Sequence, residues 1–264
     1  MLVVTLGTGT GIPAKGRGCA GVYCRVAGEH VVLDAGSGTL RQLFKLGVSY
    51  LDLDRIFLTH FHPDHCLDLV SMLFAMRIPP PAPRDSGRAG QPARTKPLTV
   101  YGPRGLKMLY RRLNTAFHGW IAPRTYRLTL RELDETTLRL DGYTVRTKRM
   151  RHSTAALGYR IEAGGKSVAY SGDTDACQAI VELGREADLL ILECSMPDAR
   201  KVAGHLTPTE CGRIARDAGC RHLALTHFYP ALLRGLPQAA RSVRRAWRGR
   251  LTLAHDLQQL PLSF

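Results

Sequence analysis

Six consecutive residues, His60-Phe61-His62-Pro63-Asp64-His65, constrain this chain more than any other feature. They supply three imidazoles and one carboxylate, the ligand types that borderline divalent ions such as Zn²⁺ prefer. The preceding residues 55–59 are typical of a short buried strand, so the cluster follows a strand end, where the chain turns and its side chains can converge. Histidines also cap helices and pack in cores, but four potential ligands in six positions favour a metal site.

Three further residues share this placement directly after a predicted strand. His152 follows a strand that ends near residue 149, Asp173 follows the strand at 168–170, and His227 follows the strand at 223–226. Loops at strand ends meet on one edge of a scaffold and commonly carry binding residues. Each residue alone would be an ordinary turn or cap residue. Together with the first cluster they predict one coordinated set.

Strand-like and helix-like segments alternate in two similar halves. The strands are expected at 2–6, 21–26, 30–33, 55–59, 98–101, 126–131, 136–140, 143–148, 157–162, 166–170, 189–192 and 222–226. The helices are expected at 40–46, 64–76, 104–117, 208–218 and 238–247, and the second of them should bury Leu67, Val70, Leu73 and Phe74. Two sheets packed face to face with helices outside would bury such strands on both sides. The prediction is an α/β fold, a four-layer αβ/βα sandwich.

No linker divides the chain, so a single domain over residues 1–264 is expected, with a flexible loop rich in proline and arginine at about 79–97. The seven cysteines form no C-x-x-C pair and predict reduced thiols. No apolar run approaches the roughly 20 residues that span a bilayer, and no signal-peptide pattern opens the chain. A cytoplasmic protein without membrane contact is therefore expected.

The chain is strongly basic, with 37 lysines and arginines against 22 aspartates and glutamates and a formal charge of +15. This excess favours an anionic partner or substrate. The basic residues cluster at 104–112, 124–131, 146–151 and 241–250, where Tyr110, Tyr126 and Trp247 are interleaved with them. That combination suits nucleic acid, although each run equally fits the solvated face of a helix or strand.

The ordered set of motifs resembles the metallo-β-lactamase superfamily, and its ribonuclease Z-like branch in particular. The motifs are Leu6-Gly-Thr-Gly-Thr-Gly-Ile-Pro13, Asp34-Ala-Gly36, the H-x-H-x-D-H cluster, Tyr101-Gly-Pro103, His152 with Gly158-Tyr-Arg160, Ser171-Gly-Asp-Thr174, Gly204-His-Leu-Thr207 and Thr226-His227. The resemblance implies the sandwich fold and two metal ions, expected to be Zn²⁺ with Mn²⁺ or iron as alternatives. It also implies the ligands: His60, His62 and His152 for one ion, Asp64, His65 and His227 for the other, and Asp173 between them.

The resemblance further implies a hydrolase. Two cations about 3.5–4 Å apart polarise the substrate's oxygens and stabilise an in-line displacement. Asp64 would also orient the nucleophile, and His205 would contact the scissile phosphate and help to protonate the leaving oxygen. Glu193 would orient His205. Arg17 and Thr207 are expected near the substrate, although Thr207 also fits the cap of the helix beginning at residue 208.

One departure concerns the substrate. Bacterial ribonuclease Z typically inserts a long arm that grips transfer RNA between the Gly158-Tyr-Arg160 and Ser171-Gly-Asp173 motifs, and this chain has only a short hairpin there. Arg84, Arg88, Arg94 and Lys96 of the 79–97 loop would offer a different contact surface, and a disordered, linker-like loop without a partner fits the same residues equally well. A homodimer is expected by analogy only.

Three functions are compatible with these residues. The leading hypothesis is a di-metal phosphodiesterase acting on RNA or a smaller nucleotide diester. The second keeps the metals but cleaves a carboxylic ester, lactone or sulfate ester. The third is a non-catalytic RNA-binding protein with structural metals, and it is the weakest because closed structural sites usually lack an open, carboxylate-rich position.

Overall fold

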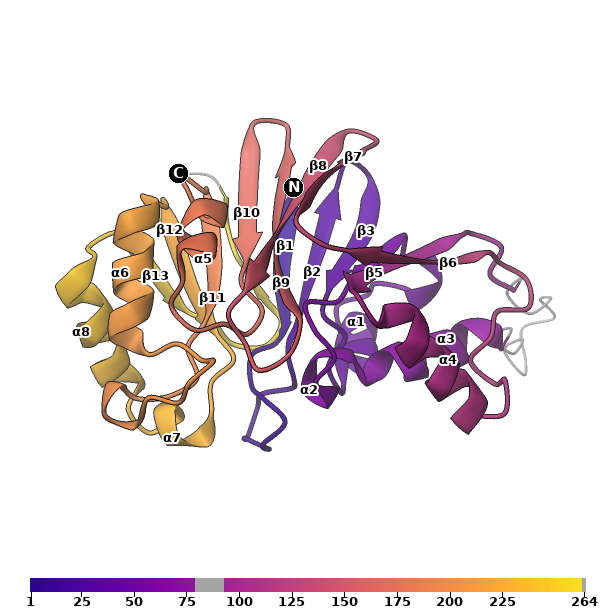
Figure 1. Ribbon diagram of the computed structural model, residues 1–264, viewed down its shortest axis with the longest axis horizontal. Coiled ribbons are helices and arrows are strands. Elements are labelled where there is room, and N and C mark those ends of the chain that lie inside the picture. Colours follow the sequence, from indigo (N-terminus) through magenta and orange to yellow (C-terminus); the bar gives the residue numbers. More distant parts are fainter. Residues whose placement is uncertain (79–92, 263–264) are drawn as a thin grey trace.

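The computed structural model describes residues 1–78 and 93–262. Two seven-stranded sheets lie face to face, and helices cover the outer face of each sheet (Figure 1). The predicted α/β four-layer sandwich is therefore confirmed. Each half of the chain builds one sheet and its helices, apart from the C-terminal strand β14, which joins the first sheet.

The first sheet has the strand order β14-β1-β2-β3-β4-β5-β6. Strands β3 to β6 run parallel to one another, whereas β1, β2 and β14 pair antiparallel. The strands are β1 (Leu2–Gly7), β2 (Gly21–Val26), β3 (Glu29–Leu33), β4 (Arg55–Phe57), β5 (Leu98–Pro103), β6 (Leu128–Leu133) and β14 (Gln258–Gln259).

The second sheet mirrors this plan, with the order β13-β12-β11-β10-β9-β8-β7. Strands β10 to β13 are parallel, and β7 to β10 form an antiparallel meander. The strands are β7 (Thr136–Leu140), β8 (Tyr143–Met150), β9 (Ala156–Ala163), β10 (Lys166–Tyr170), β11 (Leu189–Glu193), β12 (His222–Thr226) and β13 (Arg250–Leu253).

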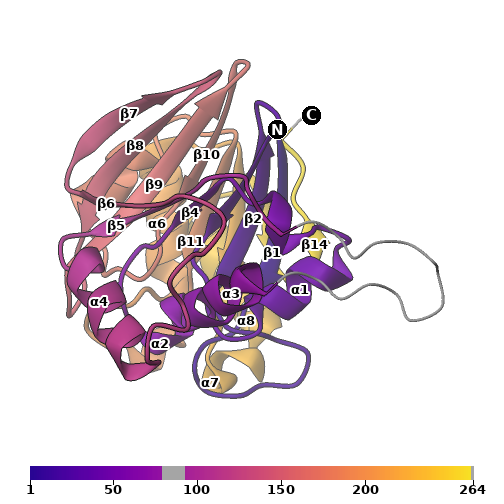
Figure 2. The same ribbon diagram turned by 90° about the vertical axis from the view of Figure 1, so that its right-hand side faces the viewer.

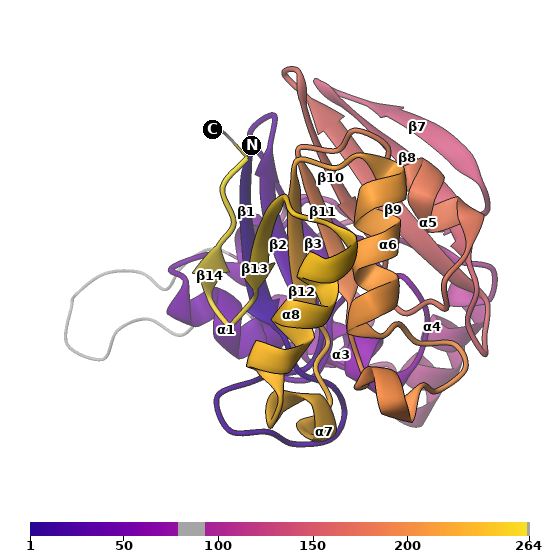
Figure 3. The ribbon, with the colours of Figure 1, turned by 90° about the vertical axis from the view of Figure 1, so that its left-hand side faces the viewer.

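Helices α1, α3 and α4 cover the first sheet (Figure 2), and α5, α6 and α8 cover the second (Figure 3). The helices are α1 (Thr39–Lys45), α2 (Pro63–Cys66), α3 (Asp68–Arg77), α4 (Leu106–Ala116), α5 (Gln178–Leu183), α6 (Pro208–Ala218), α7 (Pro230–Leu233) and α8 (Leu236–Ala246). Two 3₁₀ turns complete the described elements, η1 (Tyr50–Asp52) and η2 (Asp198–Arg200).

Three apolar cores correspond to the three spaces between the four layers. On β3, Val31 and Leu33 point to the core between the sheets, while Val32 points to the core beneath α1 and α3. The third core lies between the second sheet and α5, α6 and α8. Because both faces of these strands are buried, their sequences are apolar at consecutive positions.

The predicted helix at 64–76 is two helices, α2 and α3. The Asp68 N–H donates to the Ala35 carbonyl at 2.8 Å instead of continuing the helical ladder, which ends α2. The predicted buried face was also wrong at two positions, because Leu67 and Phe74 are 46% and 41% exposed. The inward residues are Leu69, Met72, Leu73 and Met76, which satisfy the helical period equally well.

Most of the predicted flexible loop at 79–97, including Arg84 and Arg88, lies outside the described residues. The proposed role of Arg94 as a surface contact was wrong. Its guanidinium is 3% exposed, donates to the carbonyls of Leu53 and Pro97 at 2.6 and 2.8 Å, and lies over the ring of Tyr126.

Within residues 1–78 and 93–262, the helices are all too short or too polar to cross a lipid bilayer.

Candidate metal centre

The residues of the candidate site come from strand ends along one edge of the sandwich. The H-x-H-x-D-H cluster follows β4 and continues into α2, whereas His152, Asp173 and His227 follow β8, β10 and β12. The strands β8, β10 and β12 all point the same way, so their carboxyl ends lie at one edge. The structure thus brings together all seven residues predicted as ligands.

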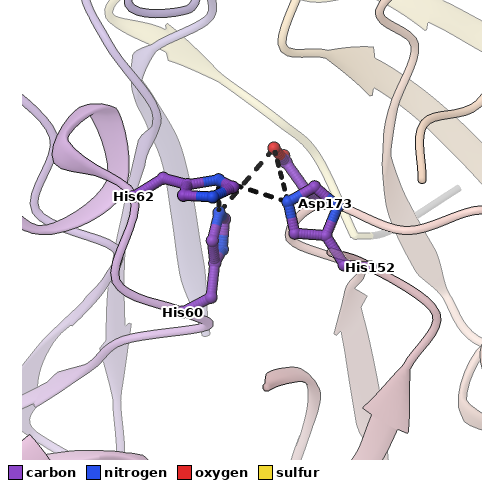
Figure 4. Close-up of side chains that lie close together, drawn as sticks. All are labelled: His60, His62, His152 and Asp173. Carbon is purple, nitrogen blue, oxygen red and sulfur yellow. Dashed lines mark hydrogen bonds and ion pairs between the residues drawn. The ribbon is translucent and has the colours of Figure 1, made fainter. Parts of the chain in front are cut away.

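One group consists of His60, His62, His152 and Asp173, which converge from both halves of the chain (Figure 4). The Nδ1 atom of His62 lies 3.0 Å from Nε2 of His60 and 3.2 Å from Nε2 of His152. Asp173 Oδ2 lies 3.8 Å from Nε2 of His60 and 3.9 Å from Nε2 of His152. Three nitrogens and one oxygen therefore face a common point.

A second group consists of Asp64, His65 and His227, next to the other oxygen of Asp173. The Nε2 atoms of His65 and His227 are 3.1 Å apart, and the latter lies 3.4 Å from Asp64 Oδ2. Asp173 Oδ1 lies 3.2 Å from His65 Nε2 and 3.5 Å from His227 Nε2. The two oxygens of a single carboxylate thus face the two groups.

The outer nitrogens of four of these histidines already have hydrogen-bond partners. The Nδ1 atoms of His60 and His65 contact Thr59 Oγ1 and Asp34 Oδ2 at 3.0 and 2.8 Å. Those of His152 and His227 contact the Gly204 carbonyl and Ser195 Oγ at 2.9 and 3.1 Å. A proton on each outer nitrogen leaves the lone pair of Nε2 directed into the site, which is the tautomer that a metal requires.

The electrostatics also fit a cation. Asp173 is buried, and its Oδ1 accepts no hydrogen bond from the described residues. A buried carboxylate oxygen without a partner costs folding free energy unless a cation compensates its charge. Burial opposes ionisation of Asp173, but His227 and His65 outweigh it and hold its pKa well below the usual range. Burial lowers the pKa of His60 to about 2, so its imidazole is neutral and its nitrogen lone pair can bind a metal. The chain therefore carries a site for divalent metal.

His205 lies at the rim of the two groups, with its side chain 15% exposed. Its Nδ1 lies 3.0 Å from Glu193 Oε1 and 3.3 Å from Ser195 Oγ. Burial lowers the pKa of His205, but the hydrogen bond and charge of Glu193 outweigh it and raise the pKa above its ordinary value. Glu193 is itself buried and accepts from the Thr174 N–H at 2.9 Å, so the pair is rigidly placed.

Known proteins resemble this chain in sequence and in fold. Residues 29–228 match the family model of the β-lactamase superfamily domain. A ribonuclease Z of Nocardia farcinica is 30% identical over 98% of this chain and 97% of its own length, and one of Streptomyces coelicolor is 29% identical with the same coverage. The chain belongs to the ribonuclease Z-like branch of the metallo-β-lactamase superfamily. It is accordingly a metal-dependent hydrolase.

Solved structures agree with this membership. The human short-form tRNase Z has a TM-score of 0.78 to this structure, at 26% identity and full coverage of both chains. The metallo-β-lactamase fold protein YhfI of Bacillus subtilis has a TM-score of 0.81 at 23% identity, covering 98% of each chain, and shows the fold alone.

The ribonuclease Z relatives differ from this chain in length. The alignment with the Streptomyces protein extends over 314 positions, against 264 residues here, so that relative has segments this chain lacks. Between Gly158-Tyr-Arg160 and Ser171-Gly-Asp173, the structure has only the β9–β10 hairpin, which turns at Gly164 and Gly165. The predicted absence of a long arm at this position is confirmed.

Sequence reasoning missed Asp34 as a residue of the site. Its carboxylate is fully buried and accepts from the Thr59 N–H and hydroxyl at 2.7 and 2.9 Å. It also contacts His65 Nδ1 at 2.8 Å and accepts from the Tyr170 hydroxyl at 2.9 Å. Asp34 therefore supports both metal groups. It directly follows β3, which is the signal already used for His152, Asp173 and His227.

Lys201 and Asp175 were also missed, and they hold the loop that carries His205. Lys201 Nζ donates to Asp175 Oδ1 at 2.8 Å and to the His205 carbonyl at 2.6 Å. Asp175 Oδ2 accepts from the Gly204 N–H at 3.0 Å, and the Gly204 carbonyl contacts His152 Nδ1. One loop thus links a candidate ligand to His205. No local sequence signal marks either residue.

Two predicted substrate residues have structural contacts. The Nη1 group of Arg17 donates to Thr8 Oγ1 and the Ala254 carbonyl at 2.6 and 2.7 Å, and the guanidinium lies over the ring of Phe228. Thr207 is buried at the start of α6, where its N–H and hydroxyl donate to Glu210 Oε2 at 2.9 and 3.1 Å. This geometry supports the capping role of Thr207, and a substrate contact by either residue stays a prediction.

Proposed function

We propose that this metal-dependent phosphodiesterase cleaves RNA with a pair of zinc ions. The observation that carries the proposal is the placement of Asp173, whose two oxygens face two separate groups of nitrogen and oxygen donors. His60, His62 and His152 would hold one ion, and Asp64, His65 and His227 the other. Imidazole and carboxylate donors suit zinc, and they also admit manganese or iron.

Two divalent ions in these groups would polarise the phosphate oxygens and stabilise the charge of an in-line displacement. The chain's own residues supply orientation and a proton. Asp64 Oδ2 accepts from the Gly11 N–H at 3.0 Å, which fixes the carboxylate beside the second group, where it would orient the attacking water. The bond from phosphorus to the leaving oxygen breaks as the water attacks.

His205 would complete the reaction by donating the proton that the leaving oxygen needs. Its Nδ1 is engaged with Glu193, so Nε2 is the nitrogen available to carry that proton. The raised pKa of His205 keeps a larger share of the imidazole protonated near neutral pH. Glu193 acts through His205 as a positioning residue.

The test is turnover of bis(p-nitrophenyl) phosphate and of short RNAs by purified protein loaded with zinc or manganese. We expect metal-dependent release of p-nitrophenolate and cleavage of RNA. A panel of p-nitrophenyl carboxylic and sulfate esters is the comparison for the acyl and sulfuryl alternatives, and kcat/KM should be highest for the phosphodiester. No metal-dependent turnover of any phosphodiester would eliminate the proposal.

We further propose that two copies associate through the outer helices of the first sheet. Phe44, Phe74, Phe117 and Trp120 are 41–83% exposed there, which is unusual for large apolar side chains. They line two neighbouring cavities of about 520 and 430 Å³ that share Ser71. Sedimentation should give the mass of a dimer, and Phe44→Asp should give the mass of a monomer.

A cytoplasmic location is also proposed. All seven cysteines are free thiols, as a reducing compartment would keep them. Cell fractionation with an antibody against the chain would test this.

A further inference from the structure

One long segment of the chain contains no acidic residue. From residue 86 to residue 131 the sequence has no aspartate or glutamate, but it has ten arginines and lysines. Its described part forms β5, α4 and β6 at one end of the molecule, on the right in Figure 1. Eight of its described cations are exposed. Lys96 pairs with Asp54 at 2.8 Å, and the other seven are Arg104, Lys107, Arg111, Arg112, Arg124, Arg127 and Arg131.

The basic residues on β8 differ from these cations because they form ion pairs with carboxylates. There, Arg146 pairs with Glu162 at 3.1 Å, Lys148 pairs with Glu182 at 2.9 Å, and Arg149 pairs with Asp134. In the described part of the chain, none of these seven cations, on or beside α4 and β6, is within ion-pair distance of a carboxylate. The charge on β8 is locally neutralised. Near α4, Glu132 accepts from the backbone N–H groups of Gly105 and Lys107 at 3.0 and 3.1 Å, and the cations further along the helix have no such neighbour among the described ion pairs.

The start of α4 adjoins the candidate metal centre. A Cβ atom at Gly105 would lie 3.5 Å from the ring of Phe61, the residue between His60 and His62. Arg104 also lines a cavity of about 590 Å³ together with Thr154 and Ala155, which follow His152 closely in the chain. The cations of α4 therefore begin at the edge of the site and lead away from it.

Two of these cations share one face of α4. Lys107 and Arg111 are four residues apart in the helix, which is the spacing of one helical face, and Arg104 lies just before the helix begins. With a rise of about 1.5 Å per residue, Lys107 and Arg111 lie about 6 Å apart along the axis. Such exposed point charges along a helix suit an extended polyanion rather than a single small anion.

We propose that the exposed cations at the start of α4 and along this helix bind the backbone of single-stranded RNA next to the scissile phosphate. This proposal rests on the proposed function. A strand whose phosphate reaches the metal centre would continue over Phe61 and Arg104 onto Lys107 and Arg111. This surface binds the substrate in a chain that lacks the long arm between β9 and β10. It contacts phosphates and not base edges, so it confers affinity without sequence preference.

The experiment compares two matched triple variants in the full chain. Lys107→Ala/Arg111→Ala/Arg112→Ala removes three exposed charges from α4. Arg241→Ala/Arg244→Ala/Arg245→Ala removes three exposed charges from α8, on the opposite side of the molecule in Figure 1. Binding of a 5′-labelled single-stranded RNA of about 12 nucleotides is followed by fluorescence anisotropy over a range of salt concentrations. Circular dichroism checks that both variants are folded.

We expect the α4 variant to bind this RNA about tenfold or more weakly at low salt. The slope of log K against log salt concentration should decrease in magnitude by about two for this variant. Each lost phosphate contact on a single strand contributes about 0.7 to that slope, and three contacts are removed. The α8 variant should change affinity by less than about threefold, and both variants should turn over bis(p-nitrophenyl) phosphate like the parent, since this small substrate has no strand to lie along α4. The proposal is overturned if the α4 variant keeps the parental affinity and salt slope, or if the α8 variant loses as much.

Binding and turnover separate this proposal from the proposed function. The anisotropy measurement needs no catalysis, so a chain that fails to cleave any phosphodiester still reports on the α4 surface. Conversely, metal-dependent cleavage of bis(p-nitrophenyl) phosphate together with equal RNA affinity in all three proteins would uphold the proposed function and refute the docking surface.

Discussion

The two halves of the molecule supply the metal centre in different ways. The first half provides His60, His62, Asp64 and His65 within six residues, the first two just before the short helix α2 and the other two within it. The second half provides single residues from separate strand ends, such as His152 after β8 and Asp173 after β10. The first contribution is fixed by local backbone geometry, whereas the second depends on the packing of distant strands. Variants that separate these two kinds of support should therefore behave differently.

The largest effect is expected at Asp173, where the two halves meet. Asp173→Asn removes the charge that faces both groups, so metal content should fall by about half or more and phosphodiesterase turnover should be lost. Elemental analysis and the bis(p-nitrophenyl) phosphate assay measure the two quantities. Removing the metal from the parent with a chelator should give the same loss, and added zinc should restore only the parent. Full turnover by Asp173→Asn would contradict a bridging role.

The same difference between the halves explains which parts of the site could be predicted from the sequence. The positions of most strands and the H-x-H-x-D-H cluster follow from local patterns, and the structure brings the seven predicted ligands together. The residues that hold the site in the second half could not be predicted from local patterns, because Lys201 and Asp175 meet only after the loop at 201–205 folds back. Asp34 has the same signal as the predicted ligands, a polar residue directly after a strand. Because Gly36 follows two residues later, a simple turn was the more economical interpretation of this segment.

The errors have a similar origin. Leu67 and Phe74 fit a helical period as well as Leu69 and Met72 do, and only the sheet decides which face is covered. Arg94 looked like a loop cation, and nothing in the sequence shows that backbone carbonyls around η1 and Pro97 surround it. Long-range packing fixes both features, so neither was accessible from one sequence.

The next largest effect is expected at His205, which belongs to the second half but is not among the seven predicted ligands. His205→Ala should lower kcat for RNA by about 10²–10⁴, the usual contribution of a general acid. With bis(p-nitrophenyl) phosphate the loss should be much smaller, because p-nitrophenolate leaves without protonation. The ratio of the two losses is the measurement, and metal content is the control. Equal losses on both substrates would instead indicate that His205 supports metal binding.

A smaller effect is expected for Asp34→Asn in the first half. Asp34 holds Thr59 and His65 in their orientation, and loss of such a supporting partner typically lowers metal affinity about 10–100-fold. Zinc titration against a competing chelator measures the change. Asp188→Asn is a matched control, since Asp188 is also a buried carboxylate that accepts from the Ser167 N–H at 2.8 Å but lies away from the site. If both variants lose the same affinity, the effect of Asp34 is general destabilisation.

The smallest effect is expected for Lys201→Met in the second half. Lys201 is one-third exposed and holds the His205 carbonyl and Asp175, so its loss should loosen the loop without removing any donor from the metal groups. We expect kcat for RNA to fall by about three- to tenfold, with KM and zinc affinity nearly unchanged. Lys201→Arg should restore most of the activity, because a guanidinium can make the same bonds from a similar position. A loss of zinc affinity as large as that of Asp34→Asn would show that the loop supports His152 more than His205, and that the second half is held as rigidly as the first.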